Sequence, residues 1–208
     1  MTHLPAQWTA RDVAAECLAV ILRAATFTVW GSDERTFQLQ RVLTGWPHVS
    51  EPKFRTPSAS IGDVGDEAFD DNGAIESADD EDDANDLVTY RAEASGSFSV
   101  NIWATDQPEL DALRAGIPAL FRGGSGNHSL MCEVGDTILP TTFKNRSITG
   151  KVRLSLSTLP RDTTDAMSVR GERHARFAVD WDAEVVTSTE AQFVDGFANR
   201  GGVTTEEI

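Results

Sequence analysis

The densest group of potential metal ligands in this chain is a carboxylate-rich segment at residues 61–87. It contains twelve Asp or Glu residues and no Lys or Arg. With Gly73 at the sixth position of a calcium-binding loop, Asp70 takes the third position and Asp79 the twelfth. The first position, normally Asp, then falls on Ala68, and no flanking helix pair is predicted. A solvated acidic segment is the favoured interpretation, and weak cation binding is the alternative.

The acidity of the chain is local. The formal net charge is −15, and the twelve carboxylates of the acidic segment leave −3 for all other residues. The low isoelectric point therefore describes one segment and indicates neither an acidic cleft nor a basic substrate. Sequence-specific DNA binding is not expected, because no helix-turn-helix pattern accompanies this charge. No stretch approaches the roughly 18 apolar residues that cross a bilayer, so no membrane partner is expected.

Catalytic and metal-binding patterns are weak elsewhere. The four histidines are scattered, and none has a partner at zinc-ligand spacing. The glycine-rich stretch at 123–126 lacks the Lys-Ser/Thr of a phosphate-binding loop, and Asn127 stands where a nucleophile elbow needs its second glycine. Two cysteines, Cys17 and Cys132, lie on apolar patterns and are predicted to be reduced core thiols. We therefore expect no enzymatic activity, no metal and no cofactor.

Basic residues cluster modestly in the C-terminal half. The ordinary interpretation is that they are the polar sides of exposed strands and loops. The functional alternative is an interface that pairs with acidic groups on a neighbouring subunit. The candidate interface residues are Lys151, Arg153, Arg161, Arg170, Arg173 and Arg176.

Two helices are predicted to organise these groups. The first runs from about Thr9 to Ala25 and buries a stripe of Val13, Cys17, Val20, Ile21 and Ala24. The second follows a strand at about 90–103. Asp106 caps it and Glu109 completes a capping box. Because Gly116 and Pro118 disfavour helix, we expect a kink or an early end near Ala115.

Antiparallel strands are predicted for the C-terminal third. The clearest is a strand in which Phe177, Val179, Trp181, Ala183 and Val185 alternate with polar residues, which is typical of a sheet with one wet face. The range 160–171 is expected to be a projecting polar loop. The fold class is therefore α+β, a mixed, mostly antiparallel sheet flanked by two helices.

Four parts of the chain are expected from these patterns. Residues 1–60 form an N-terminal helix and an extended linker of a single domain, and residues 61–87 form a flexible acidic insertion. Residues 88–190 form a strand-helix-strands core, and residues 191–208 form a C-terminal tail.

Three stretches resemble the tail-terminator (tail-completion) proteins of tailed phages. They are the amphipathic opening helix, the strand-to-helix passage from Phe98 to Leu113, and the alternating late strand from Arg173 to Val185. The resemblance implies a tail-terminator-like fold and a hexameric ring that caps the tail tube, stops its polymerisation and joins it to the head connector. The implied partners are other copies of the chain, the tail tube protein, the head-side connector protein, and DNA that passes through the lumen without sequence-specific binding.

The resemblance also implies a location in the tail or neck of the virion, after synthesis in the host cytoplasm. A head-completion or connector subunit is the alternative, because such a subunit would also form a ring through contacts between copies. A monomeric ligand-binding domain, which would use a groove between sheet and helix, is the alternative from a different class. The acidic segment at 61–87 departs from the compact pattern of the family.

Overall fold

The protein is built from segments spread along most of the chain. The computed structural model describes residues 10–31, 34–45, 56–63, 74–78, 87–122, 129–134, 147–163 and 173–190. In chain order, these residues form α1 (Ala10–Ala24), β1 (Phe27–Val29), β2 (Arg35–Phe37), β3 (Arg41–Thr44), β4 (Ser58–Asp63), β5 (Ala74–Ala78), β6 (Leu87–Ala104), α2 (Gln107–Leu120), β7 (Ser129–Val134), β8 (Ser147–Asp162) and β9 (Arg173–Glu190).

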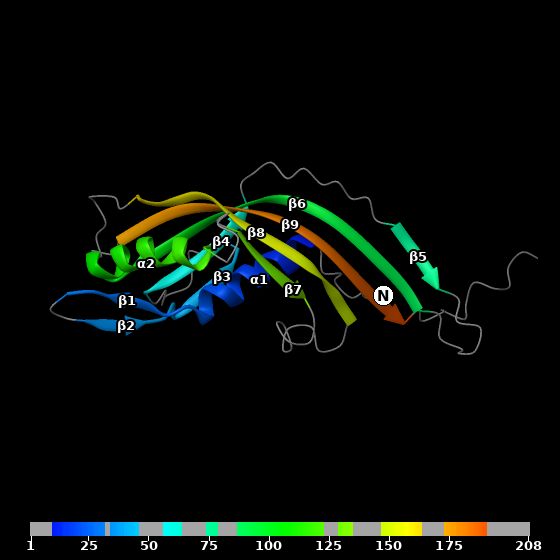
Figure 1. Cartoon of the computed structure of the whole chain (residues 1–208), viewed down its shortest axis with the longest axis horizontal. Helices are drawn as coiled ribbons and strands as arrows, with labels where there is room; N and C mark the ends of the chain where they lie inside the picture. The colour runs from blue at the N-terminus through cyan, green and yellow to red at the C-terminus, as the bar shows by residue number, and fades with distance from the viewer. Residues whose placement is uncertain are drawn as a thin grey trace, which may run out of the picture.

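A curved sheet of seven strands carries both helices on one face (Figure 1). The strand order is β3-β4-β6-β9-β8-β7, and β5 pairs with the far end of β6. Only the β3–β4 pair is parallel, and the other pairs of this sheet are antiparallel. Strands β1 and β2 form a separate hairpin beside α2. The prediction of an α+β fold with a mixed, mostly antiparallel sheet and two helices is confirmed.

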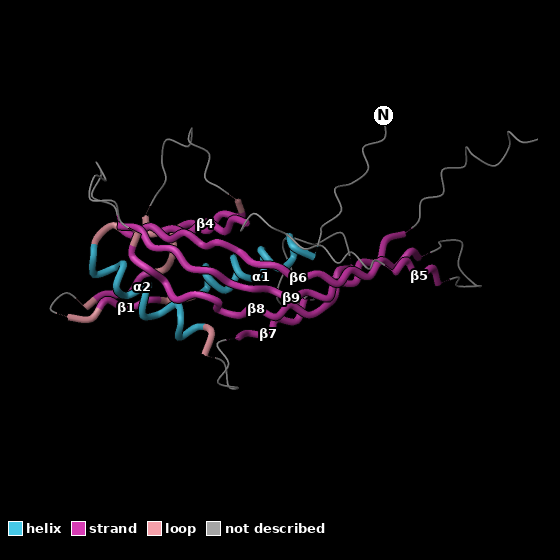
Figure 2. Tube along the Cα trace, turned by 90° about the horizontal axis from the view of Figure 1, so that it is seen from above, coloured by secondary structure: helices cyan, strands magenta, loops and turns pink. Residues whose placement is uncertain are grey.

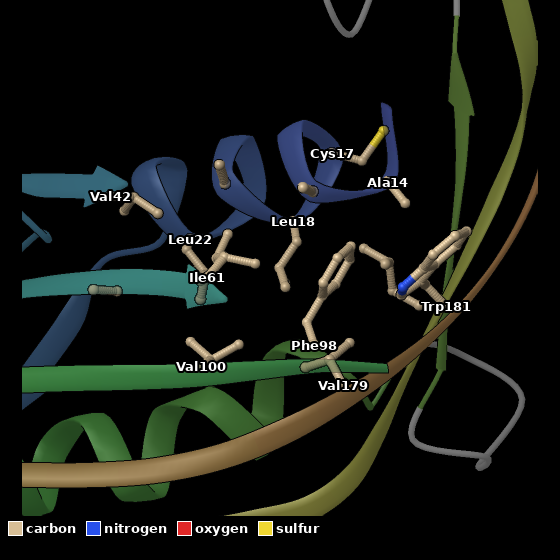
Figure 3. Packing of buried hydrophobic residues seen from close by; sticks show 14 of the residues in the cluster. Ala14, Cys17, Leu18, Leu22, Val42, Ile61, Phe98, Val100, Val179 and Trp181 are labelled. Carbon is tan, nitrogen blue, oxygen red and sulfur yellow. The ribbon is translucent and has the colours of Figure 1, made fainter. Parts of the chain in front are cut away.

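Helix α1 is close to its predicted bounds, but its buried stripe is rotated. Val13 and Cys17 are buried as predicted, together with Leu18 and Leu22, whereas Ala24 is exposed. Leu18 and Leu22 lie one turn apart on the same face of the helix and point at the sheet (Figure 3). Leu18 and Leu22 therefore join Val13 and Cys17 in the contact with the sheet, whereas Val20 and Ile21 are only partly buried.

Helix α2 begins as predicted and ends later than predicted. The Glu109 amide donates to Asp106 Oδ1 at 2.9 Å, and the Thr105 amide donates to Glu109 Oε2 at 3.0 Å, so Asp106 and Glu109 form a capping box whose return bond goes to the residue before the N-cap. The expected end near Ala115 is wrong, because the helix continues to Leu120. Pro118 lies in the last turn, where its missing N–H removes one hydrogen bond. Neither helix is long and apolar enough to cross a membrane, within the part of the chain that the structure describes.

Gly116 is compatible with the continuing helix for a packing reason. A Cβ atom at this position would lie 2.6 Å from Cδ1 of Phe27, so the glycine lets β1 approach α2 closely. Phe27 in turn packs against Phe37, with ring centroids 5.8 Å apart. The glycine that disfavours helix in the sequence is therefore the residue that lets the β1–β2 hairpin dock on α2.

The core lies between the sheet and the two helices. Trp181 is 3% exposed and stacks on Phe98 with ring centroids 5.5 Å apart (Figure 3). A Cβ atom at Gly96 would lie 3.0 Å from the indole, so the absence of a side chain there makes room for the ring. The predicted buried face of the last strand is confirmed, because Phe177, Val179, Trp181, Ala183 and Val185 are all buried.

Two expected boundaries differ from the structure. Strand β4 crosses residue 61, because Ile61 continues the alternation that places Ala59 on the buried face. Residues 74–78 form β5 against β6, within the expected insertion. Strands β3, β4 and β5 thus join the core of residues 88–190 in one sheet, whereas β1 and β2 stay outside it. Residues 64–73, 79–86 and the tail at 191–208 lie outside the described residues.

The long strands give the sheet its extended shape. Strands β6 and β9 have 18 residues each and pair along their whole length, from Leu87 opposite Glu190 to Ala104 opposite Arg173. Figure 2 shows these strands continuing past α1 toward β5. Strand β8 runs through Pro160 to Asp162, so the loop expected at 160–171 begins later. Irregular pairing between Leu156 and Arg161 accommodates the proline.

Candidate interface on the outer face of the sheet

Among the residues that the structure describes, no helix covers the second face of the sheet, which we call the outer face. It carries the residues that alternate with the buried ones along each strand. Across β6, β9, β8 and β7, directly opposed residues line up in rows. The first row is Glu93, Glu184, Lys151 and Glu133; the second is Ser95, Asp182, Arg153 and Met131; the third is Ser97, Asp180, Ser155 and Ser129.

The predicted interface residues Lys151 and Arg153 lie within these rows. Lys151 is directly opposite Glu184 on one side and Glu133 on the other, and Arg153 is opposite Asp182. Carboxylates of the same chain therefore flank both cations, which favours the ordinary interpretation for this pair. A hollow of about 530 Å³ lies over the first two rows. Met131, which is 63% exposed, is the largest apolar side chain in its lining.

Arg161 and Arg176 meet at the other end of the outer face. They are directly opposed on β8 and β9, and both are exposed. Among the ion pairs of the described residues, neither arginine has a carboxylate partner. Arg176 Nε donates to Asn101 Oδ1 at 2.9 Å. Like charges placed directly opposite one another destabilise a sheet, so this pair is a good place for an external anion.

The remaining two predicted interface residues do not join this group. Arg173 is exposed and begins β9 opposite Ala104, in the alternate set of residues that faces the helices. Arg170 lies outside the described residues. The structure therefore divides the six predicted residues: two in the charged rows, two at the opposite end of the outer face, and two apart from both.

Three buried polar side chains lie beside Arg176 on the outer face. They are Ser58, Ser60 and Asn101, each at most 1% exposed. Ser60 and Asn101 are directly opposed across β4 and β6. Within the described chain, Ser58 Oγ, Ser60 Oγ and Asn101 Nδ2 have no hydrogen-bond partner. Buried polar groups are nearly always hydrogen-bonded, so this cluster marks a place where a further acceptor or a water would be stabilising.

This buried cluster is a feature that sequence reasoning missed. Serine and asparagine on the polar side of a strand normally indicate a wet surface. Their burial depends on the pairing of β4 with β6 and on neighbours from other strands, such as Trp103, which is opposite Ser58. The local pattern that bears on this cluster is the alternation of Ser97, Ser99 and Asn101, which correctly places Asn101 on the face opposite to Phe98, Val100 and Ile102.

His174 is a packing residue at the same end. Its ring lies 5.2 Å from the ring of Trp103, centroid to centroid, and its Nδ1 is 2.6 Å from Thr163 Oγ1. Burial and the nearby Arg176 guanidinium lower the pKa of His174 below its ordinary value. The ring is therefore neutral at neutral pH. The other three histidines lie outside the described residues.

The two cysteines are free and buried, as predicted. Burial, with smaller effects of Cys132 and Glu16, raises the pKa of Cys17 to about 12. Burial also raises the pKa of Cys132. Both thiols are therefore protonated at neutral pH, which makes them poor nucleophiles and poor metal ligands.

A metal site is not formed by the residues that the structure describes, since they contain no group of three suitable ligands. The calcium-loop alternative at Asp70, Gly73 and Asp79 falls outside them, and it stays untested.

A second hollow lies between β1 and α2. Its volume is about 680 Å³, and small residues of α2, including Ala112, Ala115 and Ala119, form much of its wall. Trp30 stands at its rim and is 81% exposed. An exposed tryptophan beside a hollow suits contact with an apolar surface.

The outer face with its hollow, and the separate hollow between β1 and α2, therefore offer charge, hydrogen-bond donors and a few exposed apolar side chains, which are typical of a protein–protein contact. The chain matches no protein-family model, and no curated protein is similar to it.

Proposed function

We propose that this chain is a structural virion protein of a tailed phage or phage-like particle. It forms a ring at the head-proximal end of the tail tube, ends polymerisation of the tube and joins the tail to the head connector. It works by shape and self-association and performs no catalysis. Its partners are other copies of itself, the tail tube protein and the head-side connector protein.

The observation that carries this proposal is the one-sided cover of the seven-stranded sheet. Both helices pack on the inner face, and the outer face carries rows of charged residues from four strands. A sheet with no described helix on one face, extended by 18-residue strands, provides a large surface for neighbouring subunits.

The two edges of the sheet add to the support. In the described sheet, β3 pairs only with β4 and β7 pairs only with β8. Each edge strand therefore keeps one row of unpaired backbone groups, which can bind another chain. The edges differ in sequence: β7 presents Met131 and Glu133, whereas β3 presents Arg41 and Thr44. Different surfaces that meet head to tail can close a ring.

A head-completion or connector subunit is the second candidate, because the same open face and edges would serve it. It differs in its neighbours: it would contact the head on one side and the terminator on the other. A monomeric ligand-binding domain would instead rely on the hollow between β1 and α2. Its wall is mostly small side chains, with Asp111 as its one charged residue, which gives little polar specificity.

Electron microscopy of labelled particles tests the proposal. The full chain carries a small tag, and gold-labelled antibody against the tag is located on purified virions. The proposal expects label at the junction of head and tail, on the tail side of the neck. Label on the capsid, at the distal tail tip or on no particle contradicts it. Label on the head side of the neck favours the connector.

Mass measurement on the purified chain provides a separate test of self-association. A hexameric ring has six times the 22.6 kDa of one chain. Because subunits of this kind can stay monomeric until they meet the tube, the mass is measured with and without the tail tube protein of the same particle. A chain that stays monomeric in both conditions contradicts the ring.

A further inference from the structure

We propose that the outer face is the contact between neighbouring copies, in which the donor end of one copy receives carboxylates from the acidic rows of the next. The donor end consists of Arg161, Arg176, Asn101 and Ser60. The acidic rows are the three rows that contain Glu93, Glu133, Asp180, Asp182 and Glu184. This inference rests on the ring of the proposed function, and it names the surfaces that build the ring.

The donor end has unused hydrogen-bonding capacity. Arg161 and Arg176 are directly opposed and form no ion pair among the described residues. Arg176 is exposed, and its Nε donates to Asn101 Oδ1 at 2.9 Å. Behind it, Asn101 Nδ2 and Ser60 Oγ are buried without partners. An arriving carboxylate would relieve the repulsion between the two exposed arginines and accept hydrogen bonds from their guanidinium groups, while the buried Asn101 positions Arg176.

The acidic rows carry the complementary charge. They hold five carboxylates against two cations, Lys151 and Arg153, so their formal charge is −3. Asp180 is the most suitable contact point. It is exposed, and its opposed residues on both neighbouring strands are the uncharged Ser97 and Ser155. The same face of one chain thus has a basic end and an acidic centre.

Within the described chain, no ion pair joins the two patches. Their nearest members on β9, Arg176 and Asp180, are four residues apart, which corresponds to roughly 13 Å along the strand. Each copy therefore presents one patch of each sign to its surroundings. A closed head-to-tail ring satisfies both patches of every copy, which is the heterologous geometry, whereas a two-fold contact would satisfy them in a dimer; the mass of the oligomer distinguishes the two. Charge complementarity of this kind also fixes which surfaces meet.

A charge-swap experiment tests this contact. The first variant is R161E/R176E, and the second is D180R/D182R. Each variant alone opposes like charges, so we expect the dissociation constant between copies to rise roughly 100-fold or more. An equal mixture restores both contacts: the intact acidic rows meet the intact donor end, and the two reversed patches meet each other. Native mass spectrometry of the full chains at low salt, with and without the tail tube protein of the same particle, should show mixed oligomers with alternating variants.

A matched control separates the surface from net charge. R11E/R122E makes the same change of four charge units on residues that are not part of the outer face. It should assemble like the wild type, and circular dichroism should show all variants folded. Dissociation of this control to the same extent as R161E/R176E would overturn the inference.

Further outcomes decide against the contact. Variants that assemble alone as well as the wild type would overturn it, and so would a mixture that stays monomeric while the wild type forms oligomers. If R161E/R176E still assembles but loses retention of duplex DNA in a gel-shift assay, the donor end is a nucleic-acid surface instead. The tagged-virion experiment is independent, since a label at the neck supports the ring even when the charge swap fails.

Discussion

The two faces of the sheet are built from the same strands and obey different physical constraints. Along β9, Phe177, Val179 and Trp181 point to the helices and are buried, whereas Arg176 and Asp180 point outward and are exposed. The inner face is specified by apolar area and shape, because every side chain there must fill a fixed space. The outer face is specified by which charges become neighbours.

This difference shows which feature of the sequence determines each face of the sheet. Alternation within one strand is enough to specify the inner face. The outer face depends on register, since Lys151 is flanked by Glu184 and Glu133 only in the observed pairing of three strands. A shift of one residue in the pairing of a single strand would move its outer side chains to the buried face, and the charges of the rows would no longer be opposed. Two residues adjacent in sequence therefore have different roles: one packs in the core and stabilises the fold, and the next lies on the face that we propose for recognition.

Adjacent residues on β9 give the sharpest test of this separation. Trp181→Asp places an unpaired charge against Phe98 and removes a large buried ring, so we expect a loss of at least about 4 kcal/mol in the free energy of unfolding. Asp180→Ala, one residue earlier on the outer face, should change it by less than about 0.5 kcal/mol. Urea denaturation measures both. Equal effects would show that the faces are not distinct.

The exclusion of water from the inner face can be tested by the pH dependence of the free energy of unfolding. The pKa of Cys17 is raised from an ordinary value of 9.0 to about 12, mainly by burial. A thiol with a raised folded pKa stays protonated in the folded state while the unfolded chain loses its proton, so its contribution is full below about pH 9 and is lost as pH rises toward 12. We expect a fall in stability on the order of a few kcal/mol across this window.

The control for this titration is Cys17→Val, which keeps the apolar volume and removes the ionisable group. Urea unfolding of both proteins, under reducing conditions, gives a difference that grows with pH above about 9. Other groups titrate in this range, but they contribute equally to both proteins and cancel. Parallel curves would show that Cys17 is accessible to water and that α1 does not seal the core.

Close packing beneath the sheet predicts a smaller effect at Gly116. Alanine is the better helix former by roughly 1 kcal/mol. Its Cβ, however, would lie 2.6 Å from Phe27 Cδ1. We expect the clash to win and Gly116→Ala to cost about 1–3 kcal/mol in thermal or urea unfolding. In a Phe27→Ala background the same change should be neutral or stabilising, and additive effects of the two substitutions would exclude this explanation.

The sequence predicted the features that depend on near neighbours. The alternation of β9, the capping box at Asp106 and Glu109 and the fold class follow from local patterns, and all are observed. The same box has a partner that no local pattern contains: Arg35, on the β1–β2 hairpin, binds Asp106 Oδ2 at 2.7 Å and Glu109 Oε1 at 3.2 Å. This contact joins residues more than seventy positions apart.

The features that were missed all depend on distant pairing. The length of α2 could not be predicted, because Gly116 is permitted by Phe27 of another element. The entry of β4 and β5 into the sheet was missed because an acidic segment separates them from β6. In the same way, two of the six interface arginines and lysines meet only because bulged pairing brings Arg161 opposite Arg176. Local chemistry identified these residues, and only the register grouped them.

The smallest effect is expected where neither face is involved. Deleting residues 79–83 removes five carboxylates and leaves three residues between Ala78 of β5 and Leu87 of β6. A three-residue connection is long enough for a hairpin, and a shorter loop costs slightly less entropy to close. The free energy of unfolding should therefore change by less than about 0.5 kcal/mol.

A second variant separates length from charge in this test. Replacing the five residues by serine keeps the length of the segment and removes the same charge. Both variants should unfold at the urea concentration of the wild type. A loss above about 1 kcal/mol in the deletion alone would mean that the length of the connection supports the β5–β6 pairing. The same loss in both would mean that these carboxylates bind to the folded domain, and the acidic segment would then contact one of the two faces of the sheet.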